Sequence, residues 1–150
     1  MSYSQQPEVL EMIKEDALNG LIGDTFIEDA EERKQRIGVI VDAAIADADG
    51  EIDGYLSKRY AVPLSSPPKI INKFSKDIAV YNLFSRLGIA DGSEEKNFLH
   101  RYNSAIKFLT YVAEGKVSIG VEADDPSAAA AGFAVDSSPR LFRRSSMQGM

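Results

Sequence analysis

The amino-acid sequence predicts an all-α fold: a small bundle of about four helices, one of them long, followed by an extended C-terminal arm. Three observations predict it. Apolar residues recur at intervals of three and four along most of residues 1–115, which is the spacing of one helix face. Clusters of proline, glycine and serine interrupt this pattern. After Gly115 the helical spacing stops, which divides the chain into a helical domain, residues 1–115, and an arm, residues 116–150.

The first predicted helix covers residues 7–18. Pro7 suits the first turn of a helix, where its missing N–H would have no partner anyway. The pair Asn19-Gly20 is typical of a helix end. The apolar residues between them recur at helical spacing: Val9, Leu10, Ile13, Ala17 and Leu18.

The second predicted helix, residues 28–59, is the long one. Its apolar positions keep helical spacing for several turns: Ile37, Ile40, Val41, Ala44, Ile45, Ala48, Ile52, Tyr55 and Leu56. At 1.5 Å per residue it would be about 48 Å long, more than a compact domain of this size needs. Gly50 and Gly54 weaken a helix, so we expect them, with the neighbouring alanines, to allow close approach by another backbone.

Two more helices follow a proline-rich break. The third is predicted over residues 68–87, with Ser66 as its cap and Pro67 in its first turn. The fourth is predicted over residues 93–114, with Ser93 as its cap and acidic residues in its first turn.

Beyond Gly115, residues 116–122 alternate at a period of two and predict at most one short strand. The chain then runs through an alanine-rich stretch to a basic end, residues 137–150. These last residues have no evident place in a core, and an arm that becomes ordered against a partner explains them. A plain disordered tail is the alternative.

Charge is unevenly distributed in this 150-residue chain. Residues 1–66 carry 6 Lys/Arg and 14 Asp/Glu, a net charge of -8, whereas residues 67–150 carry 11 and 9, a net charge of +2. The acidic first half argues against a dedicated nucleic-acid binder, because such proteins must neutralise phosphates. Charge asymmetry of this kind suits head-to-tail self-association; a solvated acidic face is the plain alternative.

Several classes of protein are disfavoured by composition. No apolar run reaches the roughly 18 residues needed to span a membrane, and the N-terminus does not resemble a secretory signal. The absence of cysteine excludes disulfides, thiolate metal sites and a cysteine nucleophile. No phosphate-binding loop, dinucleotide motif or nucleophile elbow is present. We therefore expect no enzyme, no cofactor and no bound metal.

The acidic segment 47–54 suggests a calcium-binding loop as one hypothesis. An EF-hand loop that starts at Asp49 would have ligands at the first positions and Gly54 at the sixth. Its twelfth position is Tyr60, however, where a bidentate glutamate is required. The single histidine, His100, allows no histidine-based metal site and is expected to be solvated or interfacial.

A long segment, residues 44–64 (AIADADGEIDGYLSKRYAVPL), resembles the neck adaptor family of Mu-like phages and prophages. Later features resemble that family in the same order. They are Pro67-Pro68, Asp77-Ile78-Ala79 with Tyr81, Arg101-Tyr102 with Ala105-Ile106 and Leu109, Gly115-Lys116-Val117, and the closing pattern from Arg140 to Gly149. The resemblance covers most of residues 37–150. One departure is Gly50, where alanine is expected in relatives.

The resemblance implies a structural virion protein, a head–tail adaptor without catalytic activity. Such a protein forms a closed homo-oligomeric ring, here expected to be a dodecamer, between the portal protein and a tail-completion or tail-terminator protein. Packaged double-stranded DNA would pass through the ring without sequence recognition, and an acidic lumen would let it slide. The expected location is the neck of the virion, after assembly in the host cytoplasm, with no membrane involved.

Interface positions follow from the resemblance and from the composition of the arm. The residues expected to contact a neighbouring subunit, the portal or the tail are Asp47, Asp49, Glu51, Asp53, Tyr55, Arg59, Tyr60, Arg140, Leu141, Phe142, Arg143, Arg144 and Met147. Two alternatives stay open. One is another neck component, such as a tail-completion protein, and the other is a helical regulatory or nucleic-acid-binding protein, suggested by the basic end of the chain.

Overall fold

The structure is a computed structural model that describes residues 1–23, 27–86 and 96–122. The described residues form five α-helices and no strand, so the all-α prediction is confirmed. The helices are α1 (Gln6–Leu10), α2 (Glu15–Ile22), α3 (Ala30–Leu56), α4 (Lys69–Ser85) and α5 (Lys96–Ala113).

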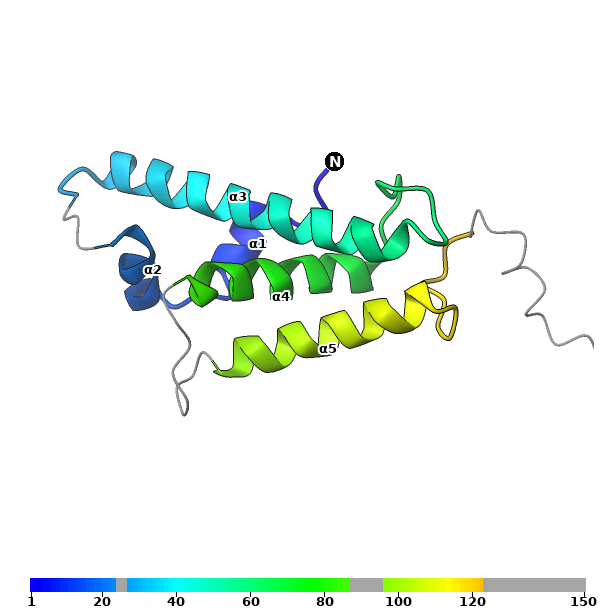
Figure 1. Ribbon diagram of the computed structural model, residues 1–150. Coiled ribbons are helices and arrows are strands. Elements are labelled where there is room, and N and C mark those ends of the chain that lie inside the picture. Colours follow the sequence, from blue (N-terminus) through cyan, green and yellow to red (C-terminus); the bar gives the residue numbers. More distant parts are fainter. Residues whose placement is uncertain (24–26, 87–95, 123–150) are drawn as a thin grey trace, which may run out of the picture.

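Three long helices, α3, α4 and α5, build the body of the molecule (Figure 1). Each runs antiparallel to the one before it, α4 lies between the other two in the view, and α4 makes the most extensive contacts with both. The short helix α1 crosses α3 and α4, and α2 packs against the start of α3. The core lies along the inner faces of these helices.

The core of α3 and α4 follows the helical spacing seen in the sequence. Along α3 the buried apolar residues are Ile37, Val41, Ala44, Ile45, Ala48, Ile52 and Leu56, and along α4 they include Ile71, Phe74, Ile78 and Leu83. Each set forms one stripe because residues three and four apart share a helix face. The apolar spacing therefore predicted the inner face of both helices.

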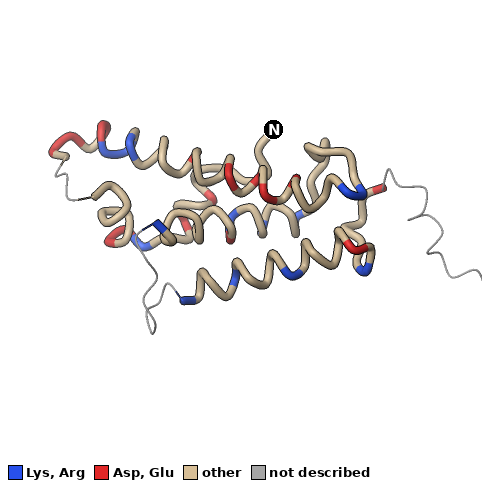
Figure 2. The backbone as a smooth tube through the Cα atoms, viewed as in Figure 1, with Lys and Arg blue, Asp and Glu red and all other residues tan. Residues whose placement is uncertain are grey.

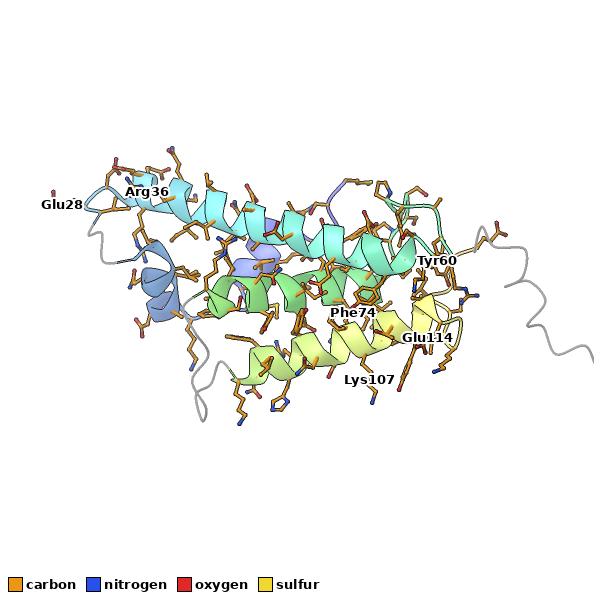
Figure 3. All side chains as sticks on the ribbon, in the orientation of Figure 1. Glu28, Arg36, Tyr60, Phe74, Lys107 and Glu114 are labelled. Atoms are coloured by element: carbon orange, nitrogen blue, oxygen red, sulfur yellow. The ribbon has the colours of Figure 1, made fainter. Side chains whose placement is uncertain are left out.

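Aromatic rings join α4 to α5. Tyr81 and Tyr102 are stacked with ring centroids 4.1 Å apart, and Phe84 and Phe98 are stacked at 4.9 Å. Phe74, labelled in Figure 3, meets Phe108 at 5.1 Å in a tilted arrangement. Aromatic pairs of these geometries are favourable beyond the area they bury. The antiparallel order of the three pairs fixes the register of the two helices.

The prediction of one helix over residues 7–18 was wrong. The chain turns between Leu10 and Glu15, which separates α1 from α2, and α2 continues through Asn19-Gly20 to Ile22. The turn lets Val9 and Ile13 both enter the core, while the apolar face of α2 packs onto α3. Tertiary packing outweighs local helical spacing in such short helices. The actual end is Gly23, whose φ of 80° suits glycine.

The other helix boundaries needed smaller corrections. The long helix begins after Asp29, whose side chain accepts a hydrogen bond from the Glu31 N–H, and its last turn is at Leu56. Pro68, and not Ser66, is the cap of α4. The predicted cap of the last helix, Ser93, lies outside the described residues. That helix does end before Gly115, as predicted, and Gly115 has a φ of 79°.

The strand predicted over residues 116–122 does not form. These residues make turns and bends, and Gly120 has a φ of 79°, which ends any extended run. The alternation nevertheless has a structural meaning, because Ile119 is buried and Val117 and Val121 pack against the core. The described residues contain no strand with which this segment could pair. Its alternating side chains are therefore buried without the backbone hydrogen bonds of a β-sheet.

The central position of α4 generates a first prediction. Ile78→Ala should lower the free energy of unfolding by about 2–5 kcal/mol, because the side chain is fully buried and its loss leaves a cavity. Val39→Ala is the control, since Val39 is 71% exposed and should change stability by less than about 0.5 kcal/mol. Urea unfolding measures both, and equal effects of the two substitutions would contradict this description of the core.

Candidate interaction surfaces

The N-terminal residues are tied to the bundle through the carboxylate of Asp49. One of its oxygens accepts hydrogen bonds from the Ser2 hydroxyl at 2.8 Å and the Tyr3 N–H at 3.0 Å. The other accepts from the Ser75 hydroxyl at 2.7 Å. Ser75 and Ser4 also share a hydrogen bond of 2.7 Å. Asp49 is nearly buried, and these donors from the N-terminus and from α4 replace the water it has lost.

Tyr3 is the anchor of this segment. Its ring is buried, and its hydroxyl donates to the Asp53 carboxylate and accepts from the Leu64 N–H at 2.9 Å. Burial, followed by the bond to Asp53, raises the pKa of Tyr3 to about 12, because both disfavour the phenolate. The Asn72 side chain donates to the Tyr3 carbonyl at 2.9 Å. Tyr3 thereby connects α3, α4 and the loop between them.

Glu8 completes the attachment of the N-terminus. Its carboxylate accepts from the Gln5 N–H at 2.8 Å in a capping box at the start of α1. That bond, together with bonds from Asn72 and the nearby Lys76, lowers the pKa of Glu8. The start of the chain is therefore part of the folded unit.

The acidic residues predicted at an interface fall into different environments. Asp49 and Asp53 lie one turn apart and serve the N-terminal segment, as described above. Asp47 is exposed and lies 3.8 Å from Arg86 at the end of α4. Glu51, one turn after Asp47, is half-buried and accepts a hydrogen bond from the Tyr102 hydroxyl at 2.9 Å. The acidic segment is thus divided between two sides of α3.

The other predicted positions near the end of α3 have internal contacts. Tyr60 is buried in the core, and Tyr55 is partly buried against it. The Arg59 guanidinium lies 5.9 Å from the Tyr60 ring and donates to the Val112 carbonyl at 3.4 Å. It therefore satisfies a carbonyl at the C-terminal end of α5, where positive charge is favoured. For Asp49 and Tyr60 the structure shows contacts within the subunit, and their contact with another chain stays a prediction.

The positions predicted in the arm cannot be compared with the structure. Arg140, Leu141, Phe142, Arg143, Arg144 and Met147 lie outside the described residues.

The outermost face of α3 carries small side chains. Ala43, Ala46, Gly50 and Gly54 are exposed, and a Cβ built on either glycine would meet nothing within 4 Å. The close approach expected at these glycines is therefore not made within the described chain. Beside them, a groove of about 630 Å³ lies between the N-terminal residues and α3 and is lined in part by Asp42, Ala46 and Gly50.

Figure 2 shows how charge is distributed over this framework. Beyond its first turns, α3 carries acidic residues and no lysine or arginine, whereas α5 carries lysine and arginine and no acid. Within residues 1–23, 27–86 and 96–122, no three acidic or histidine side chains are grouped so that they could hold a metal ion. No helix in those ranges combines the length and apolar character that a membrane span requires.

Sequence reasoning missed Tyr3 and Ser75. Ser75 is buried in the middle of α4, where a polar residue interrupts an apolar face. That interruption is the one signal that could have pointed to a polar partner such as Asp49. Nothing in the local sequence indicates that residues 2–4 would pair with residues 46 to 71 positions away.

Comparison with known proteins places these features in context. The family model described as "Bacteriophage Mu, Gp36" matches residues 3–136. The Mu-like prophage FluMu protein gp36 of Haemophilus influenzae is 29% identical over 110 residues, which cover 73% of this chain and 74% of that protein. Gene product J of Escherichia phage Mu is 28% identical over 83 residues, 55% of each protein.

The buried carboxylate generates a second prediction. Asp49→Ala should lower the free energy of unfolding by about 1–3 kcal/mol, because the buried donors of Tyr3 and Ser75 lose their acceptor. Asp47→Ala removes a carboxylate from the same helix that is 64% exposed, so it should change stability by less than about 0.5 kcal/mol. Equal effects in urea unfolding would show that Asp49 has no special structural role.

Tyr3 generates a third prediction, on pH. Its pKa is about 12 in the folded protein and 10.0 as the ordinary value, so folding favours the protonated phenol. The protonated Tyr3 phenol therefore contributes to the free energy of unfolding in full below pH 10, and this contribution is lost as the pH rises to 12. Tyr102, whose pKa burial and Glu51 also raise to about 12, acts in the same direction. The free energy of unfolding should therefore fall between pH 10 and pH 12.

The matched variants are Tyr3→Phe and Tyr102→Phe, each of which should reduce the slope of stability against pH in that range. Chemical denaturation at several pH values provides the measurement. A slope that is unchanged in both variants would contradict the assignment.

Proposed function

Since the chain belongs to the Bacteriophage Mu Gp36 family, we propose that it is a structural protein of a phage particle, a head–tail adaptor that forms a ring in the neck. The ring lies between the portal and the tail, continues the DNA channel and helps to retain the genome. The observation that carries the proposal is the family match over residues 3–136. The resemblance of residues 44–64 to neck adaptors supports the proposed position within the particle.

The physical properties of the chain support this role. Three long helices share one continuous core, which suits a structural subunit that is repeated in a closed assembly. Each copy has a net charge of -6, so a ring of copies repels DNA overall. Repulsion favours a channel through which duplex DNA slides without being held.

One alternative is favoured by a specific observation. Lys96, Arg101 and Lys107 are exposed on α5, with Arg101 also lying 3.8 Å from the Asp77 carboxylate, and such cations contact phosphates in nucleic-acid-binding proteins. The net charge of -6 opposes such binding. A gel shift with duplex DNA that weakens steeply with added salt would favour this alternative over the adaptor.

Removing the chain from a phage that encodes it tests the proposal. We expect heads and tails that accumulate separately, or heads that lose DNA, with normal particles restored when the unaltered chain is supplied. Electron microscopy and the number of infectious particles provide the measurement. A normal yield of stable, tailed particles without the chain would overturn the proposed function.

A fourth prediction concerns the arm, which we propose contacts the portal, the tail or the acidic first half of an adjacent copy. Leu141→Ala together with Phe142→Ala should lower the yield of complete particles, because burial of each side chain at a contact contributes about 1.5–3 kcal/mol in every copy. The urea midpoint of the free variant should be unchanged, since both substitutions lie beyond Ile119, the last buried core residue in the described part of the chain. Normal yields of stable particles would contradict the anchoring role.

A further inference from the structure

Three carboxylates line the groove between the N-terminal residues and α3, and no lysine or arginine lines it with them. They belong to Asp42, Asp49 and Asp53. Among the described residues, none of the three forms a salt bridge with a lysine, an arginine or the α-ammonium group of Met1. The donors that Asp49 and Asp53 have in this part of the chain are neutral groups, so the negative charge of the groove is uncompensated. A cation is the group that such a groove favours.

The rest of the groove suits a long side chain. Asp42 is exposed and, within the described ranges, has no hydrogen-bond partner. Ala46 and Gly50 lie between it and Asp53 on α3, and a Cβ built on Gly50 would meet nothing within 4 Å. The volume of about 630 Å³ leaves space for an arginine side chain, whose aliphatic stem can lie over small residues while its guanidinium donates to carboxylates.

Two other grooves in the described part of the chain have a different charge. One, of about 300 Å³, is lined by the cations Lys14 and Arg101. The other, of about 530 Å³, is lined by Glu32 and Arg36, which form a salt bridge with each other at 3.2 Å. Of these three grooves, the one beside the N-terminal residues is therefore the one that suits a basic partner.

One segment of the chain has the matching chemistry. Residues 137–150 contain three arginines and no aspartate or glutamate, and Leu141 and Phe142 stand between the arginines. The three cations match the three carboxylates of the groove, and the apolar residues match its uncharged lining, which includes Ile45 and Ala46. Charge complementarity of this kind gives a contact its specificity and opposes a like-charged occupant such as duplex DNA.

The basic segment can reach such a groove. The helices α3 and α5 finish at the same end of the bundle, since Arg59, just after α3, donates to the carbonyl of Val112 near the end of α5. The stretch of α3 from Asp42 to its end measures about 21 Å at 1.5 Å per residue. Residues 123–139 can extend to as much as about 56 Å at 3.3 Å per residue, so Arg140 can reach the groove of a copy packed alongside.

We propose that residues 137–150 of one copy bind in the groove of the next copy, with their arginines on the carboxylates of Asp42 and Asp53. The inference rests on the proposed function and names one receptor among the contacts proposed there for the arm. Each copy has one groove and one basic segment, which are unlike surfaces. Contacts between unlike surfaces of identical subunits are head-to-tail, and in a closed assembly they link every copy to the next. The N-terminal residues held by Asp49 form one wall of the groove, so that carboxylate also shapes the receptor.

Cysteine cross-linking tests the contact directly, because the chain has no cysteine of its own. Ala46→Cys places a thiol in the groove, and Ser145→Cys places one beside the arginines of the segment. The full-length chain with both substitutions is treated with a short bismaleimide, at high concentration and after incorporation into particles. Since each copy then carries one thiol of each kind, we expect a ladder of covalent multimers. In the control, Ser104→Cys, exposed on α5, replaces Ala46→Cys and should give no ladder.

Charge exchange is the second test, made in the same double-cysteine chain. Asp42→Lys alone, or Arg143→Glu with Arg144→Glu, should each reduce the ladder by about tenfold. The three substitutions together should restore a large part of it. Asp47→Lys is the matched control, because Asp47 is also exposed on α3 but lies near Arg86 and does not line the groove. A misfolded subunit could not regain the contact through a second charge reversal.

The outcomes separate this inference from the proposed function. Cross-links confined to single chains would mean that the segment binds its own groove, and they would overturn the contact between copies. A ring in the neck whose copies give no cross-link would overturn the groove as the receptor and leave the adaptor in place. A ladder that Asp47→Lys reduces as strongly as Asp42→Lys would do the same. Particles that assemble normally without the chain would overturn the proposed function itself.

Discussion

The burial of the Asp49 carboxylate is the constraint on which the rest of the structure depends. A carboxylate removed from water requires hydrogen-bond donors, and here they come from Ser2, Tyr3 and Ser75. The donors belong to the chain start and to α4, so satisfying one side chain of α3 holds three parts of the molecule together. The first residues cover part of α3 as a consequence, and the groove beside them is formed by this attachment.

The helix period then determines which side of α3 each remaining acid faces and which partners it contacts. Asp49 and Asp53 are four residues apart and share the side of α3 that faces the N-terminal segment. Asp47 and Glu51, also four apart, share the side that faces Arg86 and Tyr102. What reads in the sequence as one acidic cluster is therefore two pairs with different partners. A calcium loop needs its oxygens to converge on one point, and this division keeps them apart.

Much of the bundle could be predicted from the sequence, because the apolar residues of α3, α4 and α5 repeat at helical spacing over many turns. The break between α1 and α2 could not, since the apolar spacing runs through it and only packing of Ile13 and of α2 reveals it. The alternation of residues 117–121 coincides with side chains that pack in or against the core, but the strand predicted from it also requires a partner, which local sequence does not supply. Likewise, the acids near residue 50 were recognised as important, while the internal role of Asp49 depended on Tyr3 and Ser75, far away in sequence.

Family membership connects the fold to the proposed role. The match to the Bacteriophage Mu Gp36 family assigns the chain to the Mu-like phages. Within that setting, we propose that copies of the bundle associate into a closed ring, in which the N-terminal segment held by Asp49 belongs to each subunit.

A density map of the neck of the phage particle tests this account most directly. The account predicts a closed ring of this chain between the portal and the tail, in which the N-terminal segment of each copy remains bound to Asp49. A neck without this chain, or a ring in which the N-terminal segment is detached from Asp49, would contradict it.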